Sequence, residues 1–362
     1  MKPFYVWAGA KRLLSLIVLL LLLGATFLAG CSGAAPENGS EGTTGGQVKI
    51  TLGAYTTPRE AYREIIPLFQ QYWKEQTGQD VVFEESYLGS GAQSRAVVEG
   101  FEANIVALSL EADITRIQKA GLITHDWKDK PFGGMVSTSV VSFAVRKGNP
   151  KNIEDWHDLA RPGIEVLTPN PRMSGGAMWN ILGLYGAALR GYVQGVPAGD
   201  PAAAQDFLLK VLQNVTVMDQ SARESITNFE KGIGDVAITY ENEVWVGQMH
   251  GVDYELIIPR STILIENPVA LVDVYVDRHG NRAAVEAFLD FLFTEEAQMI
   301  FARYGLRSPD PEVAAATAGK YPPVEDLFTV AFFGGWGAAT ADIFGDNGVF
   351  TLTLARSQEG NR

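Results

Sequence analysis

The chain has 362 residues, 46% of them hydrophobic, and a formal net charge of −13. A chain of this length suits two lobes better than one small core, and its acidic balance argues against a nucleic-acid partner. The same charge means that an anionic ligand must be held by local dipoles rather than by long-range attraction. The single cysteine excludes a disulfide within the chain.

The first thirty residues predict a targeting segment. Three basic residues precede an apolar run over residues 13–23, and Leu28-Ala29-Gly30 stands directly before Cys31. This order is typical of a secretory signal, and a cysteine after Leu-Ala-Gly resembles the lipobox of bacterial lipoproteins, in which cleavage precedes the cysteine and its thiol is lipidated. An uncleaved membrane anchor and a plain signal with an incidental cysteine are the alternatives. The small, polar residues 31–47 predict a flexible tether.

Strand-like and helix-like segments alternate from residue 48 onward, which predicts an α/β fold with largely parallel sheets. Residues 57–60 read as a capping box, and residues 282–305 as one long amphipathic helix. Two extended segments, 138–148 and 254–273, are long enough to cross between lobes. We therefore expect residues 48–138 plus 264–362 to form lobe 1 and residues 139–263 to form lobe 2.

Four strand-to-helix junctions carry small or hydroxyl residues. In "VLTPNPRMSGGAMWN", residues 166–180, a strand and two prolines lead into Ser174-Gly175-Gly176 and a helix. The other three junctions are Tyr55-Thr56-Thr57, Gly89-Ser90-Gly91 and Ser221-Ala222. Helix capping alone is one explanation. The other is that helix N-termini from facing lobes converge on a small, fully ionised oxyanion.

The sequence offers no catalytic or metal-binding pattern. The four histidines, at positions 125, 157, 250 and 279, have no ligand spacing, so we expect no metal and no cofactor. An ester hydrolase using Ser174 or Ser90 as nucleophile would lack a base, because no histidine stands near either serine. We therefore expect a binding protein rather than an enzyme.

Long stretches of the chain resemble the sulfate-binding proteins of bacterial sulfate and thiosulfate ABC transporters. They include "YTTPREAYREIIPLFQQYWKEQTG", "GSGAQSRAVVEGFEANIVALSL", "FEKGIGDVAITYENE" and "FGGWGAATADIFGDNGVF", and the resemblance covers nearly all of residues 48–350. It implies a two-lobed, periplasmic-binding-protein-like (type II) fold with two crossing strands as hinge. It also implies that dehydrated sulfate is held between the lobes by backbone N–H groups, a serine hydroxyl and an aromatic N–H.

The matching ligand-binding positions are Thr56, Ser90, Ser174, Gly175, Gly176, Ala222 and Tyr240. Thr56 replaces an aspartate that the family uses only through its backbone N–H. Tyr240 replaces a tryptophan; its hydroxyl donates as the indole does, but it reaches differently and can also accept. We expect Arg223 to point to a carboxylate rather than to the anion, and Glu241 and Glu243 to act as solvated caps or ion pairs rather than as an acid–base pair.

The resemblance implies an extracytoplasmic, lipid-anchored, monomeric receptor that captures sulfate, or thiosulfate, and delivers it to the permease of an ABC importer. A receptor for another oxyanion such as molybdate, and a sensor lipoprotein, are the alternatives. Phosphate carries a proton at neutral pH, and no carboxylate stands at the matched positions to accept it. We therefore expect discrimination against phosphate, weakened somewhat by the accepting capacity of Tyr240.

Overall fold

The computed structural model describes residues 47–359. The predicted signal, Cys31 and all of the predicted tether except residue 47 therefore lie outside the described residues. The strands are β1 (Val48–Tyr55), β2 (Val81–Leu88), β3 (Ile105–Ala107), β4 (Met135–Arg146), β5 (Val166–Pro169), β6 (Val215–Asp219), β7 (Val236–Tyr240), β8 (Tyr254–Ile257), β9 (Ser261–Leu271) and β10 (Asp326–Phe328). The helices are α1 (Arg59–Thr77), α2 (Ser90–Val98), α3 (Glu111–Lys119), α4 (Gly175–Leu189), α5 (Pro201–Gln213), α6 (Ala222–Glu230), α7 (Glu241–Met249), α8 (Asp273–His279), α9 (Arg282–Phe291), α10 (Glu295–Arg303), α11 (Pro311–Thr317), α12 (Gly335–Asp342) and α13 (Val349–Glu359).

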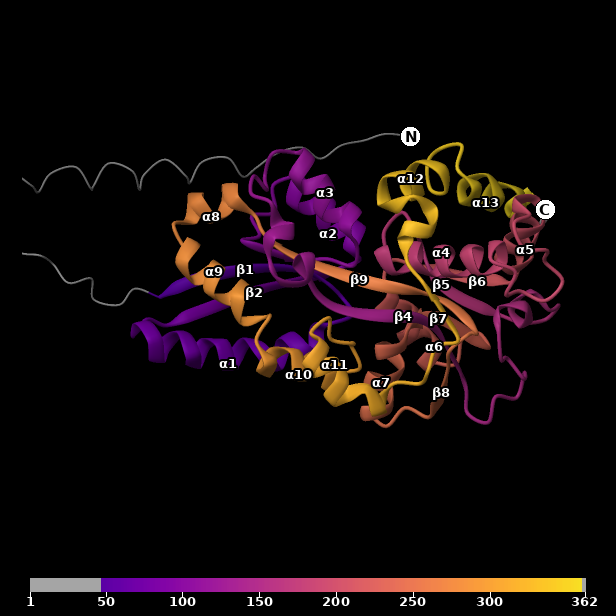
Figure 1. Ribbon diagram of the computed structural model, residues 1–362, viewed down its shortest axis with the longest axis horizontal. Coiled ribbons are helices and arrows are strands. Elements are labelled where there is room, and N and C mark those ends of the chain that lie inside the picture. The colour runs from indigo at the N-terminus through magenta and orange to yellow at the C-terminus, as the bar shows by residue number, and fades with distance from the viewer. Residues whose placement is uncertain (1–46, 360–362) are drawn as a thin grey trace, which may run out of the picture. The chain divides into compact units, whose positions relative to one another are not determined.

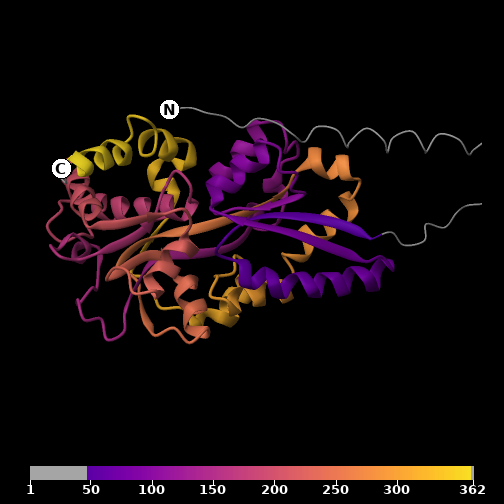
Figure 2. The ribbon, with the colours of Figure 1, turned by 180° about the vertical axis from the view of Figure 1, so that it is seen from behind.

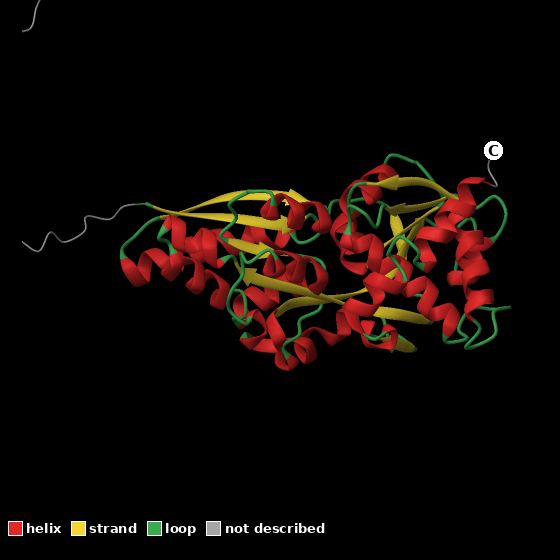
Figure 3. Ribbon diagram, turned by 90° about the horizontal axis from the view of Figure 1, so that it is seen from above, coloured by secondary structure: helices red, strands yellow, loops and turns green. Residues whose placement is uncertain are grey.

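The strands form one mixed sheet in the order β2-β1-β3-β9-β4-β7-β5-β6, with β10 paired to β9 and β8 to β4. At one end β1 is parallel to β2 and β3, and at the other β5 is parallel to β6 and β7. Between them β9 and β4 run antiparallel to each other and to their outer neighbours. Helices lie on both faces of the strands (Figure 3). The predicted α/β class with mostly parallel outer strands is confirmed.

Strands β4 and β9 connect the two ends of the sheet, as Figures 1 and 2 show. The first half of β4 pairs with β9, up to Val140 opposite Leu264, and the next residue, Val141, pairs with Tyr240 of β7. We call the part around β1, β2 and β3 lobe 1, and the part around β5, β6 and β7 lobe 2. The two crossing strands expected from the sequence are confirmed.

Each lobe has its own apolar core. In lobe 1, Phe69 of α1 packs against Phe83, Phe288 and Phe291, with ring centroids 5.0–6.1 Å apart. Lobe 2 has a separate cluster with fully buried Trp156 and Trp179. Aromatic side chains bury large apolar areas, so each core stabilises its lobe.

The C-terminal segment packs on lobe 2, although the sequence analysis placed residues 264–362 in lobe 1. After α11 the chain returns through β10, which pairs with Ser261–Ile263 of β9, and α13 then packs against α5. Trp336 of α12 lies 4.6 Å from Trp179, centroid to centroid, and both belong to the lobe 2 core. The exact lobe boundaries otherwise stay a prediction.

Two predicted helix features are wrong. Residues 282–305 form two helices, α9 and α10, because Thr294 interrupts the run and its Oγ1 accepts from Ala297 N at the start of α10. The capping box at residues 57–60 does not form, since α1 begins after Pro58 with no side-chain cap. Within residues 47–359, no helix is both long and apolar enough to cross a membrane.

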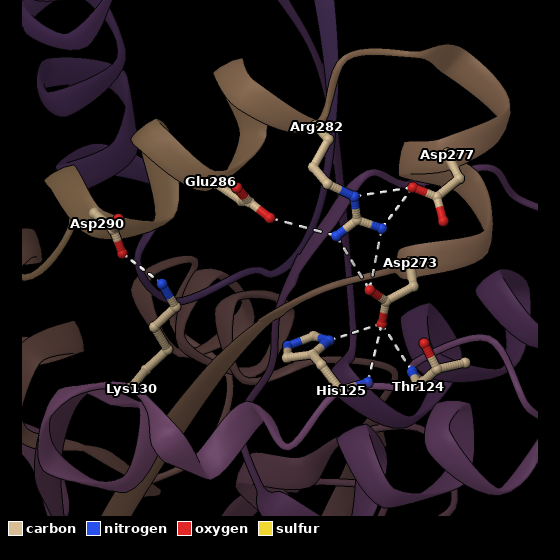
Figure 4. A network of polar contacts seen from close by, with 8 residues as sticks. All are labelled: Thr124, His125, Lys130, Asp273, Asp277, Arg282, Glu286 and Asp290. Carbon is tan, nitrogen blue, oxygen red and sulfur yellow. Dashed lines mark hydrogen bonds and ion pairs between the residues drawn. The ribbon is translucent and has the colours of Figure 1, made fainter.

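A polar network fastens the segment after α3 to α8 and α9 (Figure 4). Asp273 accepts from Thr124 N at 2.7 Å, lies 2.7 Å from His125 Nδ1, and pairs with Arg282. Although burial works in the opposite direction, hydrogen bonds from His125 and Thr124 lower the pKa of Asp273 to about 2. Asp273 is therefore ionised at neutral pH and stabilises lobe 1.

Candidate functional site

All four predicted junctions begin a helix at the end of a strand: α1 after β1, α2 after β2, α4 after β5, and α6 after β6. Two of the serines are caps. Ser174 Oγ accepts from Ala177 N at 3.4 Å, and Ser221 Oγ accepts from Glu224 N at 3.2 Å. Each takes up one of the helix N–H groups that have no intrahelical acceptor. The N–H groups of Gly175, Gly176 and Ala222, which come first in α4 and α6, remain for another acceptor.

The predicted residues of lobe 2 meet at one place. A Cβ atom added at Gly176 would lie 3.0 Å from Tyr240 Cε2 and 3.4 Å from both Ala222 Cβ and Ser174 Oγ. Each of the seven predicted site residues is less than a tenth exposed. The N-termini of α4 and α6 and the end of β7 therefore share a buried point of contact.

Lobe 1 closes over that point. Ala92 N, in the first turn of α2, donates to Met173 O across the lobes at 3.2 Å. A Cβ added at Gly89 would lie 2.6 Å from the carbonyl oxygens of Met173 and Gln220, which precede the two capping serines. Next to Thr56, the carbonyl oxygen of Thr57 accepts a 3.5 Å hydrogen bond from Arg223 Nη2 of lobe 2. The structure thus shows a closed arrangement in which only glycine fits at position 89.

Sequence reasoning missed Ser109, which lies between β3 and α3 and is 1% exposed. Its backbone N donates to Ser90 Oγ at 2.9 Å, and its Oγ lies 2.6 Å from Tyr240 OH. Its carbonyl oxygen accepts from Trp179 Nε1 at 2.9 Å and from Asn267 Nδ2 at 3.0 Å. The available signal was its place near the end of the largely apolar run of residues 104–110, directly before a helix, which is the same kind of position as the four predicted junctions.

A carboxylate lies directly behind one predicted residue. Ser90 Oγ donates to Asp113 Oδ2 at 2.6 Å, while Asp113 Oδ1 accepts from Arg116 Nη1 at 2.6 Å. The seven predicted positions hold no carboxylate themselves, yet one of them contacts this buried aspartate. The hydroxyl proton of Ser90 is therefore directed at Asp113, which leaves Ser90 its backbone N–H as a free donor.

Tyr240 is completely buried, and its ring centroid lies 6.2 Å from that of Tyr55. Burial raises the pKa of the Tyr240 hydroxyl, while its hydrogen bonds with Ser109 and Asn267 act in the opposite direction without cancelling that rise. Tyr240 therefore keeps its proton at neutral pH and can donate it.

Arg223 of α6 pairs with two carboxylates, one from each lobe, which confirms the prediction that it points to a carboxylate. Its Nη1 and Nη2 lie 2.6 Å and 2.9 Å from the two oxygens of Glu60 in α1, and its Nε lies 2.7 Å from Glu243 Oε2. Burial raises the pKa of Glu243 despite the charge of Arg223. At Glu60 burial is outweighed by the hydrogen bonds and charge of Arg223, which lower the pKa. We call these three residues the cross-lobe ion cluster.

Glu241 is also an ion-pair partner, of Arg307. Glu241 and Glu243 are at most 1% exposed, so the solvated alternative expected for them is wrong and the ion-pair alternative is confirmed. Across residues 47–359, no group of three or more histidine, cysteine, aspartate or glutamate side chains could hold a metal ion.

A family model described as "Bacterial extracellular solute-binding protein" matches residues 50–307. The chain belongs to this family. It is 44% identical to the sulfate-binding protein of Synechococcus elongatus over 325 residues, 89% of this chain and 91% of that protein. It is 35% identical to the thiosulfate-binding protein of Pseudomonas aeruginosa over 302 residues, 82% of this chain and 89% of that protein. The solved structure of the sulfate-binding protein SubI from Mycobacterium tuberculosis matches with a TM-score of 0.75 and 39% identity, covering 82% of this chain and 99% of that chain.

Membership places this solute-binding protein outside the cytoplasm, as a periplasmic-type receptor. The match to SubI also confirms the predicted two-lobed type II fold.

Proposed function

We propose that this solute-binding protein captures sulfate between its lobes and delivers it to the permease of an ABC importer, with thiosulfate as a second ligand. The observation that carries the proposal is the meeting of Gly175, Gly176, Ala222 and Tyr240 at the N-termini of α4 and α6. The names of the relatives at 44% and 35% identity support the same ligands.

The chemistry of this meeting point suits a dianion. Backbone N–H groups at the first helical positions carry partial positive charge. The Ser174 hydroxyl can also donate to an anion, because its oxygen acts as the acceptor in its hydrogen bond with Ala177 N. Each charge-assisted hydrogen bond contributes about 1.5–3 kcal/mol. Thr56 and Ser90 would add their backbone N–H groups from lobe 1. Because contacts from both lobes form only on closure, the anion selects the closed form.

We also propose a lipid anchor for the receptor and a revised boundary between its lobes. The Leu-Ala-Gly-Cys motif supports a lipid anchor at Cys31, and the glycine-rich residues 31–47 would hold the monomeric receptor away from the membrane. The packing of α12 and α13 on α5 supports a revised lobe 2 that includes β10 and everything after it.

A calorimetric titration of the full chain at neutral pH tests the ligand. We expect one-to-one binding of sulfate, weaker binding of molybdate and phosphate, and loss of sulfate binding in the double variant Ser174→Ala, Gly175→Ala. Gly319→Ala is the matched control, because a Cβ at this exposed position meets nothing within 4 Å. Binding of molybdate or phosphate in place of sulfate, or binding of none of these three anions, would refute the proposal.

A further inference from the structure

An indole N–H of lobe 2 reaches a buried carbonyl oxygen of lobe 1. Trp179, in the second turn of α4, donates from Nε1 to Ser109 O at 2.9 Å, and both residues are at most 1% exposed. Asn267 of β9 donates to the same oxygen at 3.0 Å. Trp179 and Ser109 are 70 residues apart in the chain, and neither is among the seven predicted anion contacts. This hydrogen bond therefore joins the lobes beside the anion site rather than through it.

We propose that Trp179 is a positioning residue that slows release of the anion, because its indole N–H holds the segment after β3 against α4 in the closed form. This inference rests on the proposed function and deepens it, since it concerns the lifetime of the closed complex. A hydrogen bond that forms when the lobes meet must break before they separate. It therefore acts on dissociation rather than on association.

Lobe 2 fixes the direction of the indole. The ring of Trp179 lies edge-to-face with that of Trp336 in α12, with centroids 4.6 Å apart and an interplanar angle of 80°. Both side chains belong to the lobe 2 core, and that of Trp179 is fully buried. Close packing of this kind restricts rotation of the ring. Contacts within lobe 2 therefore aim the N–H at lobe 1.

Lobe 1 and the crossing strand fix the acceptor. The backbone N of Ser109 donates to Ser90 Oγ at 2.9 Å, and Asn267 of β9 holds the carbonyl oxygen. The next residue, Leu110, packs into the lobe 2 core, and a Cβ added at Gly175 would lie 2.6 Å from its Cδ2. Because donor and acceptor are each held in place separately, their hydrogen bond forms with little loss of conformational entropy.

Trp156 provides a matched control in the same lobe. Its side chain is also fully buried, its ring lies edge-to-face with that of Phe143 at 4.8 Å, and its Nε1 donates to Ser261 O at 2.8 Å. Ser261 is in the part of β9 that pairs with β10, within lobe 2. The two indoles therefore make the same kind of hydrogen bond, one between the lobes and one inside lobe 2. Replacement by phenylalanine removes the same groups at both positions.

Binding and release of sulfate by the full chain test this inference. Calorimetry gives Kd, and release of radiolabelled sulfate into excess unlabelled sulfate gives the dissociation rate constant, koff. We expect Trp179→Phe to raise both by the same factor, about threefold to tenfold, as for one lost hydrogen bond. The association rate constant, koff/Kd, should stay within about twofold of its original value. Trp156→Phe should lower the midpoint of thermal unfolding without sulfate and leave Kd and koff unchanged.

A closer isostere separates the N–H from the volume of the ring. Benzothienylalanine at position 179 has sulfur in place of the indole N–H and nearly the shape of tryptophan. It should raise koff without the loss of packing that phenylalanine causes. It also serves if Trp179→Phe does not fold.

The two proposals fail in different ways. The role of Trp179 is overturned, with sulfate capture intact, if Trp179→Phe and Trp156→Phe raise Kd equally. It is also overturned if koff is unchanged in the position 179 variants, or if the loss of affinity lies in association. Absence of sulfate binding by the unaltered chain would overturn the proposed function and this inference with it.

Discussion

A substitution in the cross-lobe ion cluster tests how much of the sulfate affinity comes from closure of the lobes. Glu60→Gln removes the negative charge that lobe 1 contributes to Arg223, while glutamine keeps nearly the same shape. Two charge-assisted hydrogen bonds, of 2.6 Å and 2.9 Å, are weakened. Arg223 still faces Glu243 at 2.7 Å, so its charge is not left unpaired.

We therefore expect Glu60→Gln to cost about 1.5–3 kcal/mol of the free energy of closure. This is less than the roughly 3–5 kcal/mol that an unpaired buried charge costs. Since Glu60 and Arg223 come from different lobes and meet on closure, the loss appears in the sulfate affinity, as an increase in Kd of about tenfold to a hundredfold. Calorimetry gives this Kd directly, and thermal unfolding without sulfate should change little.

Glu64→Gln is the control for that experiment. Glu64 lies one turn further along α1 and pairs with Arg303 of α10, within lobe 1. Its removal should leave the sulfate Kd unchanged. The reasoning is refuted if Glu60→Gln binds sulfate as tightly as the unaltered chain, or if the two variants weaken binding equally.

Three further outcomes are expected. Gly89→Ala should weaken sulfate binding at least about tenfold, because its Cβ would meet two carbonyl oxygens of lobe 2 at 2.6 Å; binding as in Gly319→Ala would contradict this. The pKa of Asp273 is lowered to about 2 from 3.8, so its contribution to stability is full above about pH 4 and is lost as pH falls through 2. Asp273→Asn should cost about 1–2 kcal/mol in urea unfolding at pH 7 and less at pH 3; an equal cost at both would be inconsistent with this origin. Phe69→Ala should lower the free energy of unfolding by about 3–5 kcal/mol, since the ring is fully buried and packs against three phenylalanine rings; a loss below about 1 kcal/mol would contradict the packing.

Local patterns were sufficient for part of the fold. The helix start at Ser174 was predictable because a serine before two glycines and an apolar helical run acts within four residues of chain. The two crossing strands were predictable from their length and apolar character. The break at Thr294 was not, because threonine is tolerated within an apolar helical pattern, and only the packing of α9 and α10 shows where one helix ends and the next begins.

The residue types of the site follow from the sequence by itself: glycine and hydroxyl residues at the ends of strands, and a tyrosine at position 240 that can both donate and accept. The tertiary structure alone decides which of them touch. Ser109 lies 131 residues from Tyr240 in the chain, and Asp113 lies 23 residues from Ser90. A hydrogen bond depends on a few tenths of an ångström and on direction, and no local pattern carries that information across two lobes. The fold therefore determines where each proton in the site is directed.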